Sequence, residues 1–336
     1  MRVILLNMFC LVFLCVCAFW ILTTGSTPWD QVWEGAQARL MGTSQEWNPL
    51  LDERLPRLIV LICTGAAWAV SGAVMQALFH NPLATQSALG ITFGGSLLVI
   101  LVFYLDWHLH YPWSLPLAAV VGCLIALMLV YSICRVHGHI QVYDLLLTGL
   151  AISTLLVAVE RALMYALRDD WHLIQTLSEW EAGSTFDRHW RHVHMQLPLT
   201  LIGLWGCLKY RQEINILSLG DDEAKNLGVD VGKVRWRLFL CVSLLTGGAI
   251  AAVGIIAFFG MMLPHLIRLL IGPDNRRLIP MCILIGAATL ATLDVVLRSF
   301  ELYSFSIGNI SAVIGGLFFI ILLYEQRRTN LVRGGL

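Results

Sequence analysis

Long apolar stretches dominate the sequence, and its polar residues gather in the short segments between them. Each stretch is close to the roughly 20 residues that a helix needs to cross the hydrocarbon layer of a bilayer. The pattern predicts an all-α membrane protein, a single domain over 1–336, with about ten spanning helices. We place them at about 3–24, 58–79, 88–105, 114–134, 142–167, 195–209, 236–254, 255–271, 279–298 and 305–324.

The seventh and eighth helices come from one uncharged run. From Leu238 to Ile267 the sequence contains no Asp, Glu, Lys or Arg. A single helix over that run would be about 45 Å long, too long for a hydrocarbon layer of about 30 Å. Glycines interrupt it at 247, 248, 254 and 260. We therefore predict a break near residue 254 that other parts of the protein shield from lipid.

Composition supports a membrane protein and excludes a soluble enzyme. Apolar residues make up 58% of the chain and charged residues 13%, against roughly a quarter charged in soluble domains. Basic and acidic residues balance at 22 each, so no nucleic-acid face is indicated. The nine cysteines form no C-x-x-C pair, and we interpret them as small buried apolar residues.

Charge distribution suggests an orientation. Ten spans place both termini on one side, and the tail residues Arg327, Arg328 and Arg333 favour the cytoplasm by the positive-inside rule. Under this topology the larger share of Lys and Arg falls in cytoplasmic segments. The first apolar stretch, at about 20 residues, exceeds the 7–15 residues of a secretory signal core, which indicates a spanning helix.

Two stretches of small residues resemble each other. Gly65 to Val70 and Gly248 to Val253 are both rich in glycine and alanine, and each is followed by an apolar run that reaches a proline, Pro82 or Pro264. Two pseudo-related halves of this kind are typical of transporters, in which a pathway forms between related bundles. The alternative is that such helices recur through composition alone.

Short motifs follow one another in a specific order from about residue 50 to 324. They include Arg54-Leu55-Pro56-Arg57, Gly65-Ala66-Ala67, Ser71-Gly72-Ala73-Val74-Met75-Gln76, Asn81-Pro82-Leu83-Ala84, Trp180 with Gly183-Ser184, Leu217-Ser218-Leu219-Gly220-Asp221-Asp222-Glu223-Ala224, Leu263-Pro264-His265 and Leu293-Asp294. In this order and spacing the chain resembles the permease subunit of the iron-siderophore, haem and vitamin B12 class of ABC importers, the FecCD type.

The resemblance implies a fold and a set of partners. The fold is that of a type II importer permease in the bacterial inner membrane. The expected partners are two copies of a cytoplasmic ATPase, a periplasmic substrate-binding protein and a second permease subunit, in a homodimer or a heterodimer. The sequence departs from the family pattern near 301–304 and 314–317, where two expected prolines are missing.

Residues 214–233 form the largest predicted cytoplasmic segment. Ser218 or Asp221 can cap a short helix there, and Gly228 can end it. The resemblance implies that this helix couples the permease to the ATPase, and an ordinary solvated loop helix is the alternative. The coupling residues implied are Leu219, Gly220, Asp222, Glu223, Ala224, Leu227 and Gly228.

The chain carries no ATP site of its own. The stretch from Gly228 to Lys233 has one residue too few between its glycines for a phosphate-binding loop, and it lacks the Ser or Thr that would hold magnesium. We therefore expect a translocation subunit that is not an enzyme and binds no cofactor. ATP and magnesium would bind to the partner ATPase.

The resemblance also implies docking and gate residues. Arg54, Arg57 and Arg298 would form salt bridges to glutamates of the binding protein, with interfacial snorkelling as the alternative. Asn81 and Leu83 would narrow the pathway at its cytoplasmic mouth, or Asn81-Pro82 is only a tight turn. At a comparable depth Gln141, Val142 and Tyr143 precede the fifth helix, without a family motif.

Charged residues inside the predicted spans are the remaining signal. Glu160 and Arg161 point about 100° apart on a helix, so they should not satisfy each other and one can face the pathway. Asp294 and Arg298 have the i,i+4 spacing of a structural pair. We add Trp180 as a possible pathway residue. The histidines of the outer loop, His189, His192 and His194, match no zinc pattern, so no metal site is predicted.

The leading functional hypothesis is an importer permease that moves an iron-siderophore complex inward by alternating access, with haem or a corrinoid as other cargo of the class. An ion-coupled secondary transporter is the alternative, with Glu160, Arg161 or Asp294 as its coupling group. The sequence contains no Ser/His or H-E-x-x-H constellation of an intramembrane enzyme.

Overall fold

The structure is a computed structural model that describes residues 2–25, 27–135, 142–300, 302 and 305–333. Within these ranges the chain is helical and contains no β-strand, which confirms the predicted all-α class. The long helices are α1 (Arg2–Thr23), α3 (Leu55–Leu78), α4 (Ile91–Tyr104), α6 (Ser114–Arg135), α7 (Val142–Ala166), α9 (Trp190–Lys209), α12 (Val231–Val253), α13 (Phe259–Ile271), α14 (Asn275–Ser299) and α15 (Ile307–Arg333).

Short helices occupy the connections. They are α2 (Trp29–Leu40), η1 (Leu50–Arg54), α5 (Trp107–His110), α8 (Trp171–Glu181), α10 (Arg211–Leu217) and α11 (Asp221–Asn226). In the described part of the chain, five helical segments are long and apolar enough to cross a membrane: Leu50–Leu78, Ser114–Cys134, Asp144–Ala166, Val231–Val253 and Asn275–Ser299. Shorter apolar helices run over Met8–Thr23, Ile91–Tyr104, Phe259–Ile271 and Ile307–Leu322.

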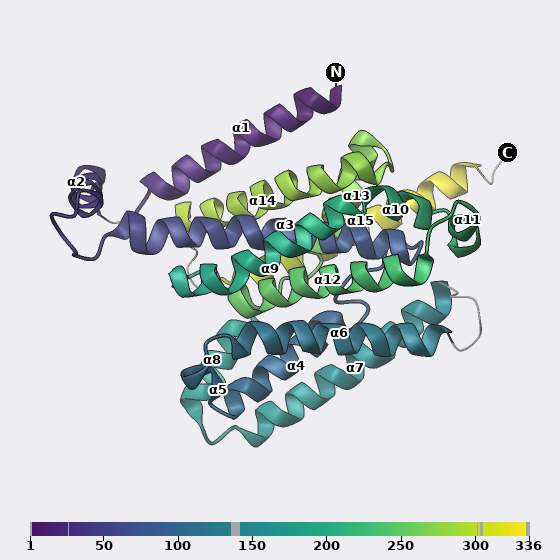
Figure 1. Cartoon of the computed structure of the whole chain (residues 1–336), viewed down its shortest axis with the longest axis horizontal. Helices are drawn as coiled ribbons and strands as arrows, with labels where there is room; N and C mark the ends of the chain where they lie inside the picture. Colours follow the sequence, from purple (N-terminus) through teal and green to yellow (C-terminus); the bar gives the residue numbers. More distant parts are fainter. Residues whose placement is uncertain (1, 26, 136–141, 301, 303–304, 334–336) are drawn as a thin grey trace.

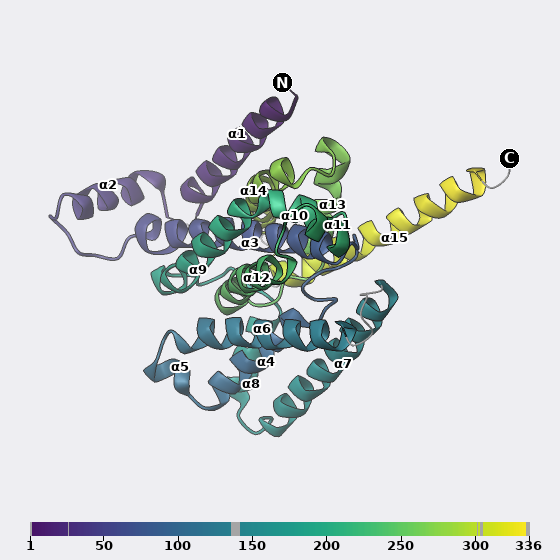
Figure 2. The same cartoon turned by 45° about the vertical axis from the view of Figure 1, so that its right-hand side comes forward.

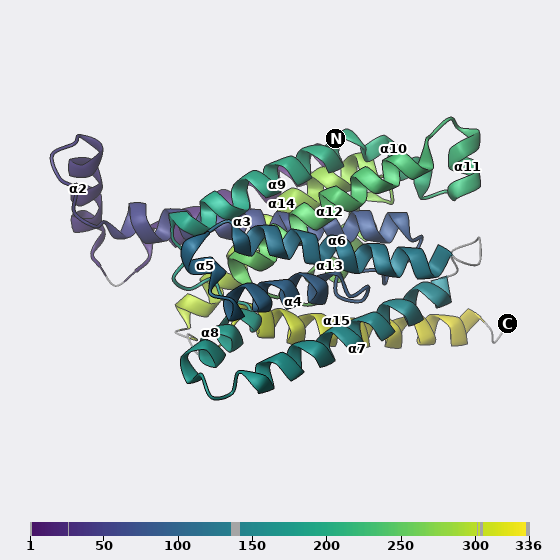
Figure 3. The same cartoon turned by 60° about the horizontal axis from the view of Figure 1, so that its bottom comes forward.

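The short helices lie at opposite ends of the bundle. The helices α2, α5 and α8 lie at one end, and α10, α11 and the end of α15 lie at the other (Figures 1 and 3). We name these the α2 end and the α11 end. Figure 2 shows α4, α6 and α7 grouped on one side of α12, with α1, α3 and α14 on the other.

The central helix is α3, which packs on α9, α12, α13 and α14. In the segment Leu50–Leu78 that contains α3, 89% of the most apolar window is buried, against 22% for Asp144–Ala166 in α7. Because the sequence patterns of the two helices are similarly apolar, this difference arises from their position. The outer surface of α7 is left for lipid or for another subunit.

Small residues let the central helices approach closely. Gly65 of α3 lies against the backbone of Gly286 in α14, and Gly72 lies against Gly260 in α13. A Cβ atom at either position would overlap a backbone carbonyl of the neighbouring helix. Helices in membranes associate through such small-residue contacts, because lipid removes the hydrophobic drive to pack large side chains together.

The predicted break between the seventh and eighth helices is confirmed. The helix α12 ends at Val253 and α13 begins at Phe259, with Gly254 and Phe258 at positive φ of 90° and 61°. The freed backbone is covered by protein: Ser184 N donates to Val253 O over 2.9 Å, and Ser311 Oγ donates to Ala257 O over 3.3 Å. The break is therefore hydrogen-bonded, as the hydrocarbon environment requires.

Both small-residue stretches of the predicted repeat lie in buried parts of the bundle. The stretch from Gly65 lies in α3 and the stretch from Gly248 in α12, and these two helices pack on each other. Each helix is followed by a non-helical connection, residues 79–90 or 254–258. This placement agrees with two halves built on one plan.

Candidate coupling, gate and docking sites

The segment 214–233 folds around the short helix α11. Ala224 is fully buried, whereas Leu219 and Leu227, on either side of α11, are 64% and 61% exposed. Gly228 follows the helix with a φ of +83°, and its N–H donates to Lys225 O over 2.9 Å. The predicted end of the helix at Gly228 is thus confirmed, because a left-handed residue after the last turn favours glycine.

The predicted cap of this helix is wrong. Gly220 occupies the N-cap position and no side chain caps the helix. Ser218 Oγ donates to Asn215 O over 2.6 Å. Asp221 instead accepts two hydrogen bonds from Arg235 of α12, over 2.9 and 2.5 Å. The spacing identified Asp221 as a residue type that caps helices, but it did not indicate that Arg235 would bind the same carboxylate.

The Asp221–Arg235 pair attaches α11 to the bundle. The Arg235 side chain is 5% exposed and that of Asp221 is 39% exposed, so the pair reaches from the bundle interior to its surface. The hydrogen bonds from Arg235 hold the pKa of the Asp221 carboxyl below its usual value. Arg235 Nη1 also donates to Tyr131 OH of α6 over 3.5 Å. The short helix is thereby tied to both α12 and α6.

The preceding helix α10 is tied to α14. Asn215 Nδ2 donates to Asp274 Oδ1 over 2.6 Å, and Asn275 N donates to Asn215 Oδ1 over 2.7 Å. Asp274 also caps α14, since it accepts from Arg276 N over 3.0 Å. The pKa of Asp274 is lowered, chiefly by the hydrogen bond from Asn215. One asparagine thus bridges the end of α10 and the beginning of α14.

A second contact joins α10 to the end of α3. His80 Nε2 lies 2.6 Å from Leu217 O, the last residue of α10. His80 follows α3 with a positive φ of 50° and directly precedes the predicted gate residue Asn81. Sequence reasoning missed His80, Asn215, Arg235 and Asp274. Only Asp274, which caps a helix that begins earlier than we predicted, carried a readable signal.

The predicted gate residues have two different environments. Asn81 is buried and forms a turn, in which Leu83 N donates to Asn81 Oδ1 over 2.9 Å. Leu83 lines a cavity of about 140 Å³ with side chains that include Met261, His265 and Phe318. Gln141 lies outside the described residues. Tyr143 lies in the first turn of α7, and the structure does not describe its side chain.

The predicted docking arginines gather at the α2 end, but two of them are buried. Arg54 is 3% exposed and donates to Leu22 O over 2.9 Å, and Arg57 is 2% exposed and paired with Asp294. Only Arg298 keeps partial exposure, at 17% of its side chain, with Glu53 at 3.8 Å. In this structure Arg54 and Arg57 therefore have partners within the chain, and Arg298 has the largest exposed fraction of the three.

Asp294 is the centre of this cluster. Besides Arg57, it accepts from Thr185 Oγ1 over 2.9 Å and lies 3.7 Å from Arg298 Nε. The guanidinium of Arg57 also lies 4.7 Å from the ring centre of Phe186. The i,i+4 partner predicted from sequence is present, but the stronger contact comes from a different helix. The cluster joins α3, α14 and the loop after α8.

The predicted pathway residues are held by separate partners. Glu160 is 2% exposed and hydrogen-bonds to Ser96 of α4, whereas Arg161 pairs with Glu181 over 2.7 Å. The prediction that Glu160 and Arg161 do not satisfy each other is confirmed. Trp180 is buried, and its Nε1 donates to Ile250 O over 3.1 Å. Trp180 therefore supports the break after α12.

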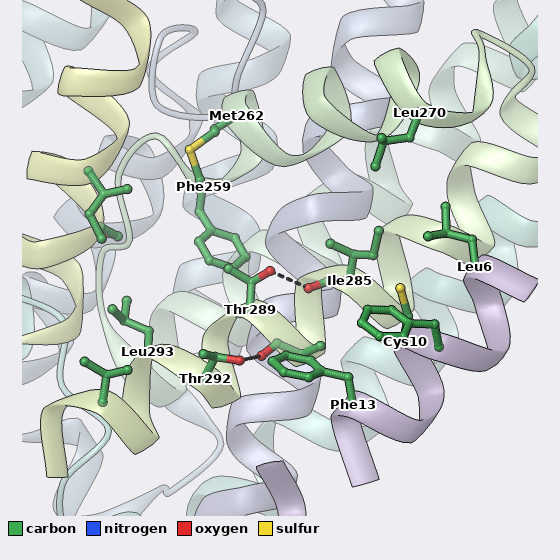
Figure 4. Close-up of a pocket in the computed structure, with 15 residues that line it drawn as sticks. Leu6, Cys10, Phe13, Phe259, Met262, Leu270, Ile285, Thr289, Thr292 and Leu293 are labelled. Carbon is green, nitrogen blue, oxygen red and sulfur yellow. Dashed lines mark hydrogen bonds between the residues drawn. The ribbon is translucent and has the colours of Figure 1, made fainter. Parts of the chain in front are cut away.

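A cavity of about 600 Å³ lies between α1, α13, α14 and α15 (Figure 4). Its walls are mostly apolar, and the hydroxyls of Thr289 and Thr292 donate to carbonyls of their own helix over 2.7 Å. It contains none of the predicted site residues. Its chemistry suits hydrocarbon and does not suit a charged chelate.

The geometry defines a helical membrane protein with two short helices, α10 and α11, bonded to the bundle at one end and a cluster of arginines at the other. The FecCD transport family matches residues 10–325. The chain belongs to this family, and its fold is that of a type II ABC importer permease.

Curated relatives agree with this assignment. The chain is 37% identical to the hemin transport system permease protein HmuU of Yersinia pestis, over 84% of each chain. It is 35% identical to the cobalamin import system permease protein BtuC of Halobacterium salinarum, over 90% of this chain and 81% of the relative. It is 32% identical to the Fe(3+) dicitrate transport system permease protein FecD of Escherichia coli, over 93% of this chain and 95% of the relative.

One solved structure matches nearly the whole chain. It is described as an inward-facing conformation of a metal-chelate type ABC transporter, and it superposes with a TM-score of 0.79 at 27% sequence identity. The match covers 95% of this chain and 99% of that chain. The predicted family and fold are therefore confirmed.

Proposed function

We propose that this chain is the translocation subunit of an ATP-driven importer that carries an iron-siderophore complex from the periplasm to the cytoplasm by alternating access. Haem and corrinoids are the other cargoes of the same class. Family membership and relatives named for hemin, cobalamin and ferric dicitrate support this proposal. We place both termini and the α11 end in the cytoplasm of a bacterial cell, with the α2 end in the periplasm.

The observation that carries the proposal is the attachment of α10 and α11 to the bundle. Leu219 and Leu227 present exposed apolar side chains beside α11. Behind them, Asp221 is bonded to α12 and Asn215 to the first turn of α14. A partner that pushes on α11 would therefore displace the ends of the spanning helices. The coupling residues Gly220, Asp222, Glu223, Ala224 and Gly228 belong to the same segment.

The contact between Leu217 and His80 extends this path to the gate. His80 lies next to Asn81, whose turn positions Leu83 in the small cavity beside α13 and α15. A shift of α10 would therefore reach Leu83 through two residues of the α3 connection. We propose this path as the route by which ATP binding to two partner ATPases opens and closes the cytoplasmic mouth.

Docking of the periplasmic binding protein is assigned to the α2 end. Of the three predicted docking arginines, Arg298 has the largest exposed surface, whereas Arg54 and Arg57 are buried. An acidic side chain on the binding protein would meet Arg298 first and would compete with Asp294 for the remaining arginines. Charge complementarity of this kind sets register and the rate of encounter. A second permease subunit completes the pathway.

The ion-coupled alternative receives no support from the buried acids. Glu160 is bonded to Ser96, and Asp294 is bonded to Arg57 and Thr185. Asp294 therefore has a charged partner that accounts for its burial, whereas the partner of Glu160 is a neutral hydroxyl.

Co-purification with the cognate ATPase tests the coupling surface. Leu219→Asp with Leu227→Asp should abolish capture of the ATPase by the purified permease, because charges would replace the apolar contact. Leu109→Asp is the matched control, since Leu109 is 68% exposed in α5 at the opposite end. Equal capture by the double variant and the control would contradict the proposed surface.

A further inference from the structure

The helix α2 lies outside the bundle with its axis across the direction of the long helices. It is seen nearly end-on in Figure 1 and lengthwise in Figure 3, at the end opposite α11. It begins at Trp29, and α1 ends at Thr23. The connection of five residues spans at most about 18 Å when fully extended. The helix is therefore held close to the level at which α1 leaves the hydrocarbon layer.

One face of α2 is apolar, aromatic and exposed. Trp29, Trp33 and Leu40 recur at helical spacing and form one stripe, and their exposed fractions are 38%, 46% and 76%. The two tryptophan rings stack with their centres 6.0 Å apart. Met41, just after the helix, is also 76% exposed. The described part of the chain leaves a substantial share of each of these side chains exposed.

The neighbouring stripe of α2 is already buried by the chain itself. Val32 and Ala36 are 1% and 2% exposed. Asn48 packs beside them, and its Nδ2 donates to Val32 O over 2.9 Å. The helix is therefore fixed to the segment before η1, and its orientation is defined. The aromatic stripe remains exposed for a partner outside the chain.

The opposite face of α2 is polar. Asp30, Gln31, Glu34 and Gln37 are all exposed. The only cation of the helix, Arg39, is paired with Asp52, so α2 offers no free positive charge to an acidic protein. An amphipathic helix with tryptophan on one face and polar side chains on the other suits the boundary between headgroups and acyl chains.

We infer that α2 is an interfacial anchor whose partner is the lipid surface at the α2 end of the bundle. Trp29, Trp33 and Leu40 face the acyl boundary, and the polar face is directed to water. The anchor holds the connection between α1 and α3, and with it the end of η1, where Arg54 lies, and the beginning of α3, where Arg57 lies. The inference requires a membrane-embedded chain but no particular cargo, so it can fail while the proposed function stands.

Spin-label accessibility tests this inference on the full chain. The background variant carries Cys15→Ser, because Cys15 is the exposed cysteine among those described. Labels are placed at Leu40→Cys on the apolar face and at Gln31→Cys on the polar face, two exposed positions. The chain is reconstituted in nanodiscs of phosphatidylcholine and phosphatidylglycerol, and relaxation by oxygen is compared with relaxation by a water-soluble nickel complex.

The inference predicts that the ratio of oxygen to nickel relaxation is severalfold higher at position 40 than at position 31. Adding Trp29→Ser and Trp33→Ser should lower the ratio at position 40, while circular dichroism confirms an unchanged helix content. Equal ratios at the two positions in the tryptophan-containing chain would overturn the inference. Protection of position 40 that appears only after the binding protein is added would also overturn it, in favour of a protein partner.

Discussion

Arg57 of α3 and Asp294 of α14 form an ion pair inside the protein, although 237 positions separate them in the sequence. Both side chains are almost completely excluded from solvent, at 2% and 1% exposure. The pair closes the α2 end of the bundle between two central helices. Its burial implies that its members depend on each other, because removing one leaves an uncompensated charge.

Asp294→Asn should lower the free energy of unfolding by about 3–5 kcal/mol, since the Arg57 guanidinium would lose its buried counter-charge. Denaturant unfolding in detergent measures the change. Arg161→Gln is the control, because the Arg161 side chain is 62% exposed and its pair with Glu181 should contribute less than about 1 kcal/mol. A loss for Asp294→Asn no larger than that of the control would contradict the structural role of the pair.

Asn215→Ala should uncouple ATP hydrolysis from transport. The variant loses the hydrogen bond to the Asp274 carboxylate, worth about 1.5–3 kcal/mol for a charged acceptor, and with it the link between α10 and α14. The number of cargo molecules moved per ATP hydrolysed is measured in the assembled transporter. Asn309→Ala is the control, at an exposed asparagine at the beginning of α15. Unchanged stoichiometry in Asn215→Ala would show that α14 is not driven through this residue.

Gly72→Ala should destabilise the bundle, because the added methyl group would overlap the Gly260 carbonyl of α13. Overpacking of this kind costs about 1–3 kcal/mol. Gly316→Ala in α15 is the matched control, since its new methyl group would meet no atom of another described helix within 4 Å and alanine favours a helix over glycine. Thermal melts of the two variants make the comparison. Similar melting temperatures would mean that α3 and α13 do not pack as closely as described.

The attachment of α11 should weaken in acid. The pKa of Asp221 is lowered in the folded protein by hydrogen bonds from Arg235, so its stabilising contribution is present above the unfolded value of about 3.9. That contribution is lost as the pH falls through the lower folded value. Amide hydrogen exchange in α11, corrected for its intrinsic pH dependence, should accelerate below about pH 4. In the Asp221→Asn variant the amide hydrogens of α11 should already exchange rapidly at neutral pH. A rate equal to that of the wild type at neutral pH would contradict the attachment.

The apolar pattern predicted the helices because their length is dictated by the bilayer. It placed the beginnings of α3 and α9 too late, since Leu55 to Arg57 and Trp190 to His194 are helical but not uniformly apolar. The break after α12 was readable from an uncharged run too long for one helix. The hydrogen bonds that cover this break could not be predicted, because Ser184 and Ser311 come from distant segments.

For the candidate sites, the sequence indicated which residues take part but not which partners they contact. The spacing of Asp294 and Arg298 suggested a local pair, but tertiary packing brought Arg57 closer to Asp294. Trp180 was selected as a possible pathway residue, and its hydrogen bond to Ile250 O near the helix break could not be predicted from the sequence. Pairs such as Asn215 with Asp274 carry no sequence signature, because they depend on how α10 packs against α14.

The central claim is that this chain supplies a gated route through the membrane and that ATP binding elsewhere drives it through α11. Cargo uptake into proteoliposomes that contain the permease, the cognate ATPase and the binding protein tests it most directly. The account predicts vanadate-sensitive uptake that disappears when Asp221–Asn226 are replaced by a flexible Gly/Ser linker. Uphill transport by the permease alone along an ion gradient, or full uptake with the linker variant, would contradict it.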